Sequence, residues 1–258
     1  MILAAAAGDV VGSIYEHMPV KTTDIPLVDE RAVFTDDTVL TMATAQAILS
    51  GQSYEQMYRS FARRYPNAGY GGNFRRWFAS DSLGPYNSFG NGSAMRVSPV
   101  GWAFDGADEV LEQAEQSAAC THDHPEGVRG AQATALSVFL ARTGTPKEDI
   151  AAELHRRFGY DLDRGIDDIR PGYRFDVTCQ GSVPEAIIAF LEAETVEESI
   201  RLAISLGGDS DTQACIAASI SQAAFGEVPR ELEAHVREKL SEELLRVNDE
   251  FCRRFVDA

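Results

Sequence analysis

The stretch Gly207-Gly208-Asp209-Ser210-Asp211-Thr212 precedes a run from Gln213 to Ile220 that is almost entirely small or apolar. The two glycines predict a turn, and the run after them predicts a helix that is buried on most of its sides. Asp209 and Asp211 then lie in the first turn of this helix, where an acid commonly caps free backbone N–H groups. A cap needs only one oxygen, whereas two acids and a hydroxyl place more negative charge in a buried site than it tolerates unpaired. We therefore expect a positive group at this site, and the adjacent sequence offers no Lys or Arg.

A second stretch has the same make-up. Phe34-Thr35-Asp36-Asp37-Thr38 precedes an apolar run from Val39 to Leu49, which predicts another helix. Two acidic helix starts far apart in the sequence favour convergence on a cation over two independent caps. Oxygen donors suit Mg²⁺ first and Mn²⁺ next, and the set is large enough for two ions about 3.5–4 Å apart. The candidate ligands are Thr35, Asp36, Asp37, Asp209, Asp211 and Thr212.

Other polar residues are less specific by themselves. Asp9 lies inside an apolar run, so it must be paired or lie near the cation. Glu16 opens a proline-containing loop, where a carboxylate is usually solvated. His122 and His124 could bind a transition metal, but the all-oxygen clusters make hydrogen bonding the favoured interpretation.

The sequence as a whole predicts an all-α protein. Its 258 residues are 44% hydrophobic, strand-type alternation is nearly absent, and no linker or repeat divides the sequence, so we expect one compact domain over 1–258 with about ten or more helices. The net charge of −17 is opposite to that of a protein that binds nucleic acid by neutralising phosphates. No signal peptide, bilayer-spanning run or disulfide pattern is evident, which predicts a cytoplasmic protein without membrane attachment. Helices are expected at 1–16, 38–50, 53–65, 106–120, 125–143, 146–158, 184–193 and 196–206, and as one terminal helix after Pro229.

Two glycine-rich loops could cradle phosphates with backbone N–H groups, although such loops are often simple turns. The first spans residues 67–73. The second, Ser88-Phe89-Gly90-Asn91-Gly92-Ser93-Ala94-Met95-Arg96, adds the flat apolar face of Phe89. Residues 161–183 form a long segment without clear periodicity, and long ordered loops are often functional.

Five motifs in order resemble the ADP-ribosylglycohydrolase family: residues 8–13, 34–38, 90–96, 121–122 and 207–212. The resemblance covers nearly the whole chain, and Gly12 to Glu16 with Gly69 to Gly72 resembles the serine-ADP-ribose and poly(ADP-ribose) hydrolase branch and its bacterial members. It implies an orthogonal helical bundle with a binuclear Mg²⁺ centre that cleaves a glycosidic bond to ADP-ribose.

The resemblance also implies roles for individual residues. Glu16 and Asp36 are the candidates for proton transfer at the scissile bond, and the two acidic stretches are the metal ligands. The matched contacts for phosphate, ribose and adenine are Gly71, Gly72, Ser88, Phe89, Gly90, Asn91 and His122. We expect a monomer acting on an ADP-ribose-bearing substrate, with nucleic acid relevant only as an ADP-ribosylated acceptor. The acceptor itself stays open, and the alternatives are a Mg²⁺-dependent pyrophosphohydrolase and a non-catalytic crystallin-like or binding protein.

Overall fold

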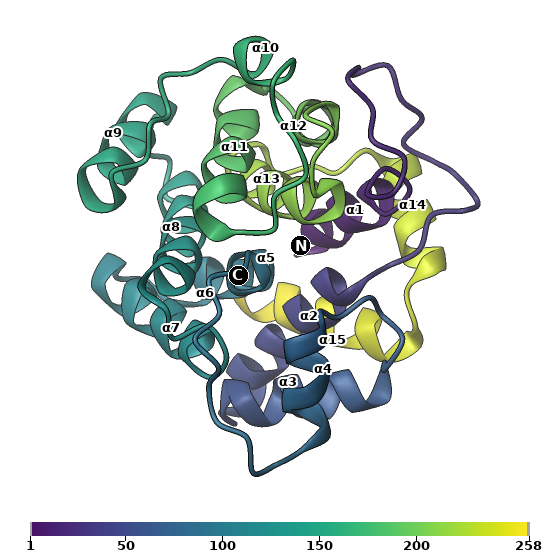
Figure 1. Ribbon diagram of the computed structural model, residues 1–258. Coiled ribbons are helices and arrows are strands. Elements are labelled where there is room, and N and C mark those ends of the chain that lie inside the picture. Colours follow the sequence, from purple (N-terminus) through teal and green to yellow (C-terminus); the bar gives the residue numbers. More distant parts are fainter. Residues whose placement is uncertain (1, 257–258) are drawn as a thin grey trace.

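The computed structural model describes residues 2–256, and helices provide its regular structure (Figure 1). No strand occurs in this range, although Gly90 and Thr178 form one isolated antiparallel bridge. The all-α prediction is therefore confirmed. The helices are α1 Leu3–Gly12, α2 Asp36–Ser50, α3 Tyr54–Arg64, α4 Gly72–Ala79, α5 Gly92–Met95, α6 Ser98–Ala103, α7 Ala107–Ala119, α8 Pro125–Arg142, α9 Lys147–Phe158, α10 Ile166–Ile169, α11 Cys179–Glu192, α12 Val196–Ser205, α13 Ser210–Phe225, α14 Arg230–Lys239 and α15 Glu242–Phe255.

Helix α13 is the central element of the fold. All of its residues from Ser210 to Gln222 are buried, and α1, α8, α11 and α12 pack against it (Figure 1). Small side chains on most faces permit this, because neighbouring helices can approach from several directions at once. The acidic start of α13 is consequently held inside the molecule.

The closest approach is between α1 and α13. A Cβ atom on Gly8 would lie 2.2 Å from the carbonyl oxygen of Ala214, and one on Gly12 would lie 2.5 Å from the Cα atom of Asp211. Both distances are far inside van der Waals contact, so these positions require glycine. Because the two glycines are one helical turn apart, they present one face of α1 to α13. This packing brings Asp9, next to Gly8, to the start of α13.

Three of the predicted helices start or end two or more residues away from the observed boundary. The first helix ends at Gly12, and residues 13–16 form turns; residue 1 lies outside the described range. The second helix begins at Asp36, because Thr35 is its N-cap and accepts a hydrogen bond from the Asp37 N–H at 3.3 Å. Helix α11 begins at Cys179 instead of Pro184, because the Thr178 hydroxyl caps it and the proline lies inside the helix.

The predicted single terminal helix is wrong. Leu240 is extended (φ −78°, ψ 146°) and ends α14, and Ser241 caps a new helix, α15, by accepting from the Leu244 N–H at 3.4 Å. The apolar stripe runs across the break because Leu240 and Leu244 are both buried. Within residues 2–256, no helix combines the length and apolar character needed to cross a membrane.

Candidate active site

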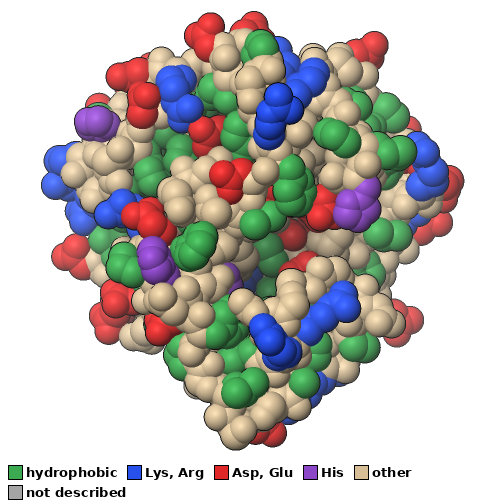
Figure 2. All heavy atoms as spheres, viewed as in Figure 1, with side chains coloured by type: hydrophobic (Ala, Val, Ile, Leu, Met, Phe, Trp, Pro, Cys, Tyr) green, Lys and Arg blue, Asp and Glu red, His purple; other side chains and the backbone are tan. Residues whose placement is uncertain are grey.

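A cleft of about 440 Å³ opens between the start of α13, the start of α2 and the glycine-rich loops. Figure 2 shows it as a hollow near the middle of the face, with acidic side chains around it. The structure brings most of the predicted site residues to its wall. Those lining it are Glu16, Thr35, Asp36, Asp37, Gly71, Gly72, Ser88, Gly90, Asn91, His122, Asp209, Asp211 and Thr212.

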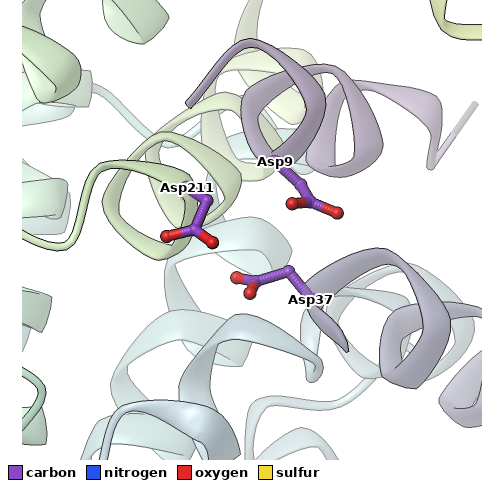
Figure 3. A group of neighbouring side chains, drawn as sticks. All are labelled: Asp9, Asp37 and Asp211. Atoms are coloured by element: carbon purple, nitrogen blue, oxygen red, sulfur yellow. The ribbon is translucent and has the colours of Figure 1, made fainter. Parts of the chain in front are cut away.

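Two groups of carboxylates meet in this cleft. Oxygens of Asp9, Asp37 and Asp211 lie within 4.8 Å of one another, and so do oxygens of Glu16, Asp209 and Asp211. Figure 3 shows the first group converging from α1, α2 and α13. Asp211 belongs to both groups, so the two acidic helix starts share one site.

Hydroxyl groups join the two helix starts at Asp37. The Thr35 hydroxyl lies 3.2 Å from Asp37 Oδ2, and the Thr212 hydroxyl lies 3.4 Å from the same oxygen. The other oxygen, Oδ1, is buried and has no hydrogen-bond partner among the described residues. A buried carboxylate oxygen without a donor is costly, and a cation bound between the acids would satisfy it. The donor set, carboxylates and hydroxyls without thiols, suits a hard divalent ion.

Asp9 organises the start of α2. Its Oδ1 accepts from the Thr35 hydroxyl at 2.7 Å, and its Oδ2 accepts from the backbone N–H groups of Thr35 and Thr38 at 2.9 and 3.1 Å. The Thr38 hydroxyl donates to the same oxygen at 2.5 Å. Four donors on one fully buried carboxylate fix the chain between Thr35 and Thr38, which places Asp36 and Asp37.

The acids raise one another's pKa values. Burial and then the charge of Asp211 raise the pKa of Asp9 to about 7. The same two causes raise the pKa values of Asp36, Asp37 and Asp209 well above the usual range, and that of Glu16 above its usual value. In each case the charged form is disfavoured because water is excluded and the nearest charge has the same sign. Such a site attracts cations.

Asp209 and Glu16 form the other end of the cluster. Asp209 Oδ2 accepts from the side-chain amide of Asn91 at 2.7 Å, and that amide also lies 3.2 Å from the Ser182 hydroxyl. Asn91 therefore orients Asp209, in addition to lining the cleft. Glu16 comes from the loop after α1, and its side chain is 29% exposed, so it is the least confined acid of the group.

The glycine-rich segments also line the cleft. The Ser88 hydroxyl accepts from the Gly90 N–H at 3.2 Å, and Gly71 and Gly72 are exposed at the start of α4. Phe89 is not among the lining residues of the cleft. Its side chain is 45% exposed, and its ring lies 5.3 Å from that of His124. An exposed aromatic ring between Ser88 and Gly90 is available for stacking at the cleft edge.

His122 is held by a chain of hydrogen bonds. Arg96 Nη2 donates to the Thr121 hydroxyl at 2.9 Å, and that hydroxyl lies 2.7 Å from His122 Nδ1. A guanidinium only donates, so the Thr121 hydroxyl accepts from Arg96, while the direction of its contact with Nδ1 depends on the tautomer of the ring. Burial and then the charge of Arg96 lower the pKa of His122, so the ring is neutral. Its Nε2 atom lies beside Gly90 and Gly92.

The sequence interpretation missed some of these contributions. Asp9 was expected to be paired or to lie near the cation but was not placed among the ligands, and Arg96 and Tyr86 line the cleft without having been singled out. The one available signal was that Asp9 interrupts an otherwise apolar helix. The roles of Arg96 and Asn91 depend on contacts to residues more than twenty positions away, which no local pattern encodes.

Comparison with known proteins agrees with this geometry. The model of the ADP-ribosylglycohydrolase family matches residues 1–257. ADP-ribosylhydrolase ARH3 from Mus musculus is 26% identical, with 87% of this chain and 82% of that protein aligned; its counterpart from Gallus gallus is 29% identical over 77% and 71%. A solved structure titled ADP-ribosylglycohydrolase-related protein complex superposes with a TM-score of 0.70 at 25% identity, covering 95% of both chains. The chain belongs to the ADP-ribosylglycohydrolase family and is a glycosidic-bond hydrolase.

Proposed function

We propose that this protein hydrolyses the glycosidic bond between ADP-ribose and an acceptor, in a reaction that depends on Mg²⁺ or Mn²⁺ and releases ADP-ribose. The observation that carries the proposal is the pair of carboxylate groups that share Asp211 on one wall of the cleft. The similarity to ADP-ribosylhydrolases supports the substrate class.

The residues proposed to hold the ions are Thr35, Asp36, Asp37, Asp209, Asp211 and Thr212. Two ions are proposed because the two carboxylate groups overlap at one residue. When bound, divalent ions neutralise the clustered acids and polarise the oxygens of a sugar and of water. The orphaned Oδ1 of Asp37 supports this assignment, since no protein donor reaches it among residues 2–256.

The chain's own groups divide the remaining work. Glu16 and Asp36 are half-buried acids at the cleft whose pKa values are raised by burial and then by the charge of Asp211, and an acid placed beside the reacting bond can donate or accept a proton there. We assign proton transfer at the scissile bond to one of these two. Gly71, Gly72, Ser88, Gly90 and Asn91 also line the cleft, and together with Phe89 they are proposed to hold the pyrophosphate, ribose and adenine. His122 Nε2 lies beside Gly90 and Gly92.

The test is incubation with a panel of defined conjugates in which ADP-ribose is linked to arginine, serine, a nucleic-acid end or a small metabolite. Reaction mixtures with Mg²⁺, with Mn²⁺ and with EDTA are compared by chromatography. We expect free ADP-ribose from at least one conjugate and no turnover in EDTA. AMP with ribose phosphate as the products would instead indicate a pyrophosphohydrolase. Binding of ADP-ribose without any turnover would indicate a binding protein.

A further inference from the structure

The chain contains three lysines, Lys21, Lys147 and Lys239, and the ammonium of each donates to backbone carbonyl oxygens. Lys21 is the most heavily engaged. Its Nζ lies 2.8 Å from the carbonyl oxygen of Arg170, 2.7 Å from that of Tyr173 and 2.5 Å from that of Leu206. An ammonium has three donors, so all of them are used.

Two of these three carbonyls lie at helix ends. Arg170 is the C-cap of α10 and Leu206 is the C-cap of α12. Carbonyl groups at a helix C-terminus lack intrahelical partners and carry partial negative charge. A compact cation is therefore well suited to join the two ends. Lys21 thereby ties the loop between α1 and α2, residues 13–35, to the segment that leads into α13.

Residues 12–21 run antiparallel to residues 207–211, which lead into α13, and contact them at three points. Gly12 packs on Asp211, and Glu16 lies with Asp209 and Asp211. Val20 and Lys21 pass over Gly207, where a Cβ atom would lie 2.8 Å from the carbonyl oxygen of Val20. Gly207 has φ +62°, a conformation that also favours glycine. Glu16 therefore lies near the middle of residues 12–21, which contact the entry into α13 at both ends.

Backbone hydrogen bonds do not hold the part of this loop that follows Glu16. Within the described chain, residues 17–22 take part in no backbone–backbone hydrogen bond, and residues 17–19 are exposed. His17, 85% exposed, lies 3.7 Å from the Glu16 carboxylate. Beyond Glu16 the loop is held first by the packing of Val20 on the core and by the Lys21 ammonium, and the bonds from Arg201 to the carbonyls of Thr23 and Ile25 come only after them.

We propose that Lys21 is a positioning residue for the reaction: its ammonium holds the Glu16-bearing loop against the turn that carries Asp209, and so fixes where the Glu16 carboxylate lies. This inference rests on the proposed role of Glu16 in hydrolysis. Lys21 contacts neither the cleft nor the candidate ligands, so it acts only through the loop.

The experiment compares Lys21→Met with Lys239→Met. Lys239 is a matched control because its Nζ donates at 2.8 Å to the carbonyl oxygen of Glu30, in the same loop but far from Glu16. We expect Lys21→Met to lower kcat about ten- to a hundred-fold, since a displacement of about 1 Å can cost that much. KM should stay within about three-fold and Lys239→Met should be near wild type.

A double-mutant cycle with Glu16→Gln identifies the route of the effect. If Lys21 acts through Glu16, adding Lys21→Met to Glu16→Gln should change kcat by less than about two-fold. If the two substitutions instead lower kcat independently, so that their factors multiply in the double variant, the positioning role is overturned and the proposed function still stands. A normal kcat for Glu16→Gln would overturn the role of Glu16 and the positioning role with it.

Hydrogen exchange supplies a readout that does not depend on turnover. The amides of Arg170, Tyr173 and Gly207, which are hydrogen-bonded beside the carbonyls that Lys21 holds, should exchange faster in Lys21→Met than in wild type and Lys239→Met, and equal exchange in all three would refute the tether. Thermal melting identifies any variant that fails to fold. In that event Lys21→Gln, which keeps one donor group, replaces Lys21→Met and should lie between it and wild type in exchange and kcat.

Discussion

Asp211 belongs to both carboxylate groups in the cleft, so Asp211→Asn tests the metal hypothesis directly. In metal-free protein its charge contributes to the raised pKa values of Asp9, Asp36, Asp37 and Asp209. The amide removes that charge with almost no change of shape. We therefore expect Asp211→Asn to be at least as stable as wild type in EDTA and to lose the stabilisation that Mg²⁺ or Mn²⁺ gives.

The size of both effects follows from the geometry. Two charged carboxylates whose oxygens lie within 4.8 Å of one another repel by about 3.5 kcal/mol or more at an effective dielectric constant of about 20. Because protonation relieves part of this repulsion, the gain in EDTA should lie between zero and a few kcal/mol. A cation at about 100 times its Kd stabilises the folded state by about 2.7 kcal/mol. For a chain of this length that corresponds to a rise in Tm of about 5–11 °C.

Melting is followed by calorimetry for wild type, Asp211→Asn and the control Asp108→Asn, each in EDTA and in Mg²⁺. Asp108 is a suitable control because it is an exposed acid in the first turn of α7. Wild type and the control should gain about 5–11 °C with Mg²⁺, and Asp211→Asn should gain little. Two results would show that Asp211 is only a helix-terminal acid. One is a wild-type Tm that is the same in EDTA and in Mg²⁺, and the other is an Asp211→Asn variant that is destabilised equally in both.

Three other predictions concern separate parts of the molecule. Phe89→Ala should weaken ADP-ribose binding about ten- to a hundred-fold in titration calorimetry, since stacking on a base contributes about 1–3 kcal/mol; unchanged affinity would exclude stacking. Gly8→Ala should lower the unfolding free energy by about 1–3 kcal/mol in denaturant titration, because its Cβ would lie 2.2 Å from the Ala214 carbonyl oxygen; wild-type stability would mean that α1 can shift freely. The pKa of Asp9 rises from 3.8 to about 7 on folding, so this acid contributes its full stabilisation below pH 3.8 and loses it as the pH rises through about 7. In EDTA, Tm should therefore be higher at pH 5.5 than at pH 7.5. A Tm that is higher at pH 7.5 would contradict the raised pKa.

Local sequence was sufficient to predict the acidic helix starts. Thr35 and Asp209 occupy the N-cap positions of α2 and α13, although α2 begins two residues before the predicted start and only the Thr35 side chain makes a capping hydrogen bond. The same local chemistry was overlooked at Thr178 and Ser241, which cap α11 and α15. At Ser241 the continuous apolar stripe concealed the break, since Leu240 and Leu244 pack into the core from two different helices.

The sequence by itself determined the all-α class and the two oxygen-rich helix starts, because helix periodicity and capping are set by near neighbours. Only the tertiary structure decided which acids meet. Asp9 reaches the cluster because Gly8 and Gly12 let α1 lie almost in backbone contact with α13, and Asp209 is oriented by Asn91, 118 residues away. Burial, which raises the pKa values of these acids, also depends on helices from the whole chain closing over α13. Such contacts follow from how the helices pack against one another, which no local stretch of the sequence specifies.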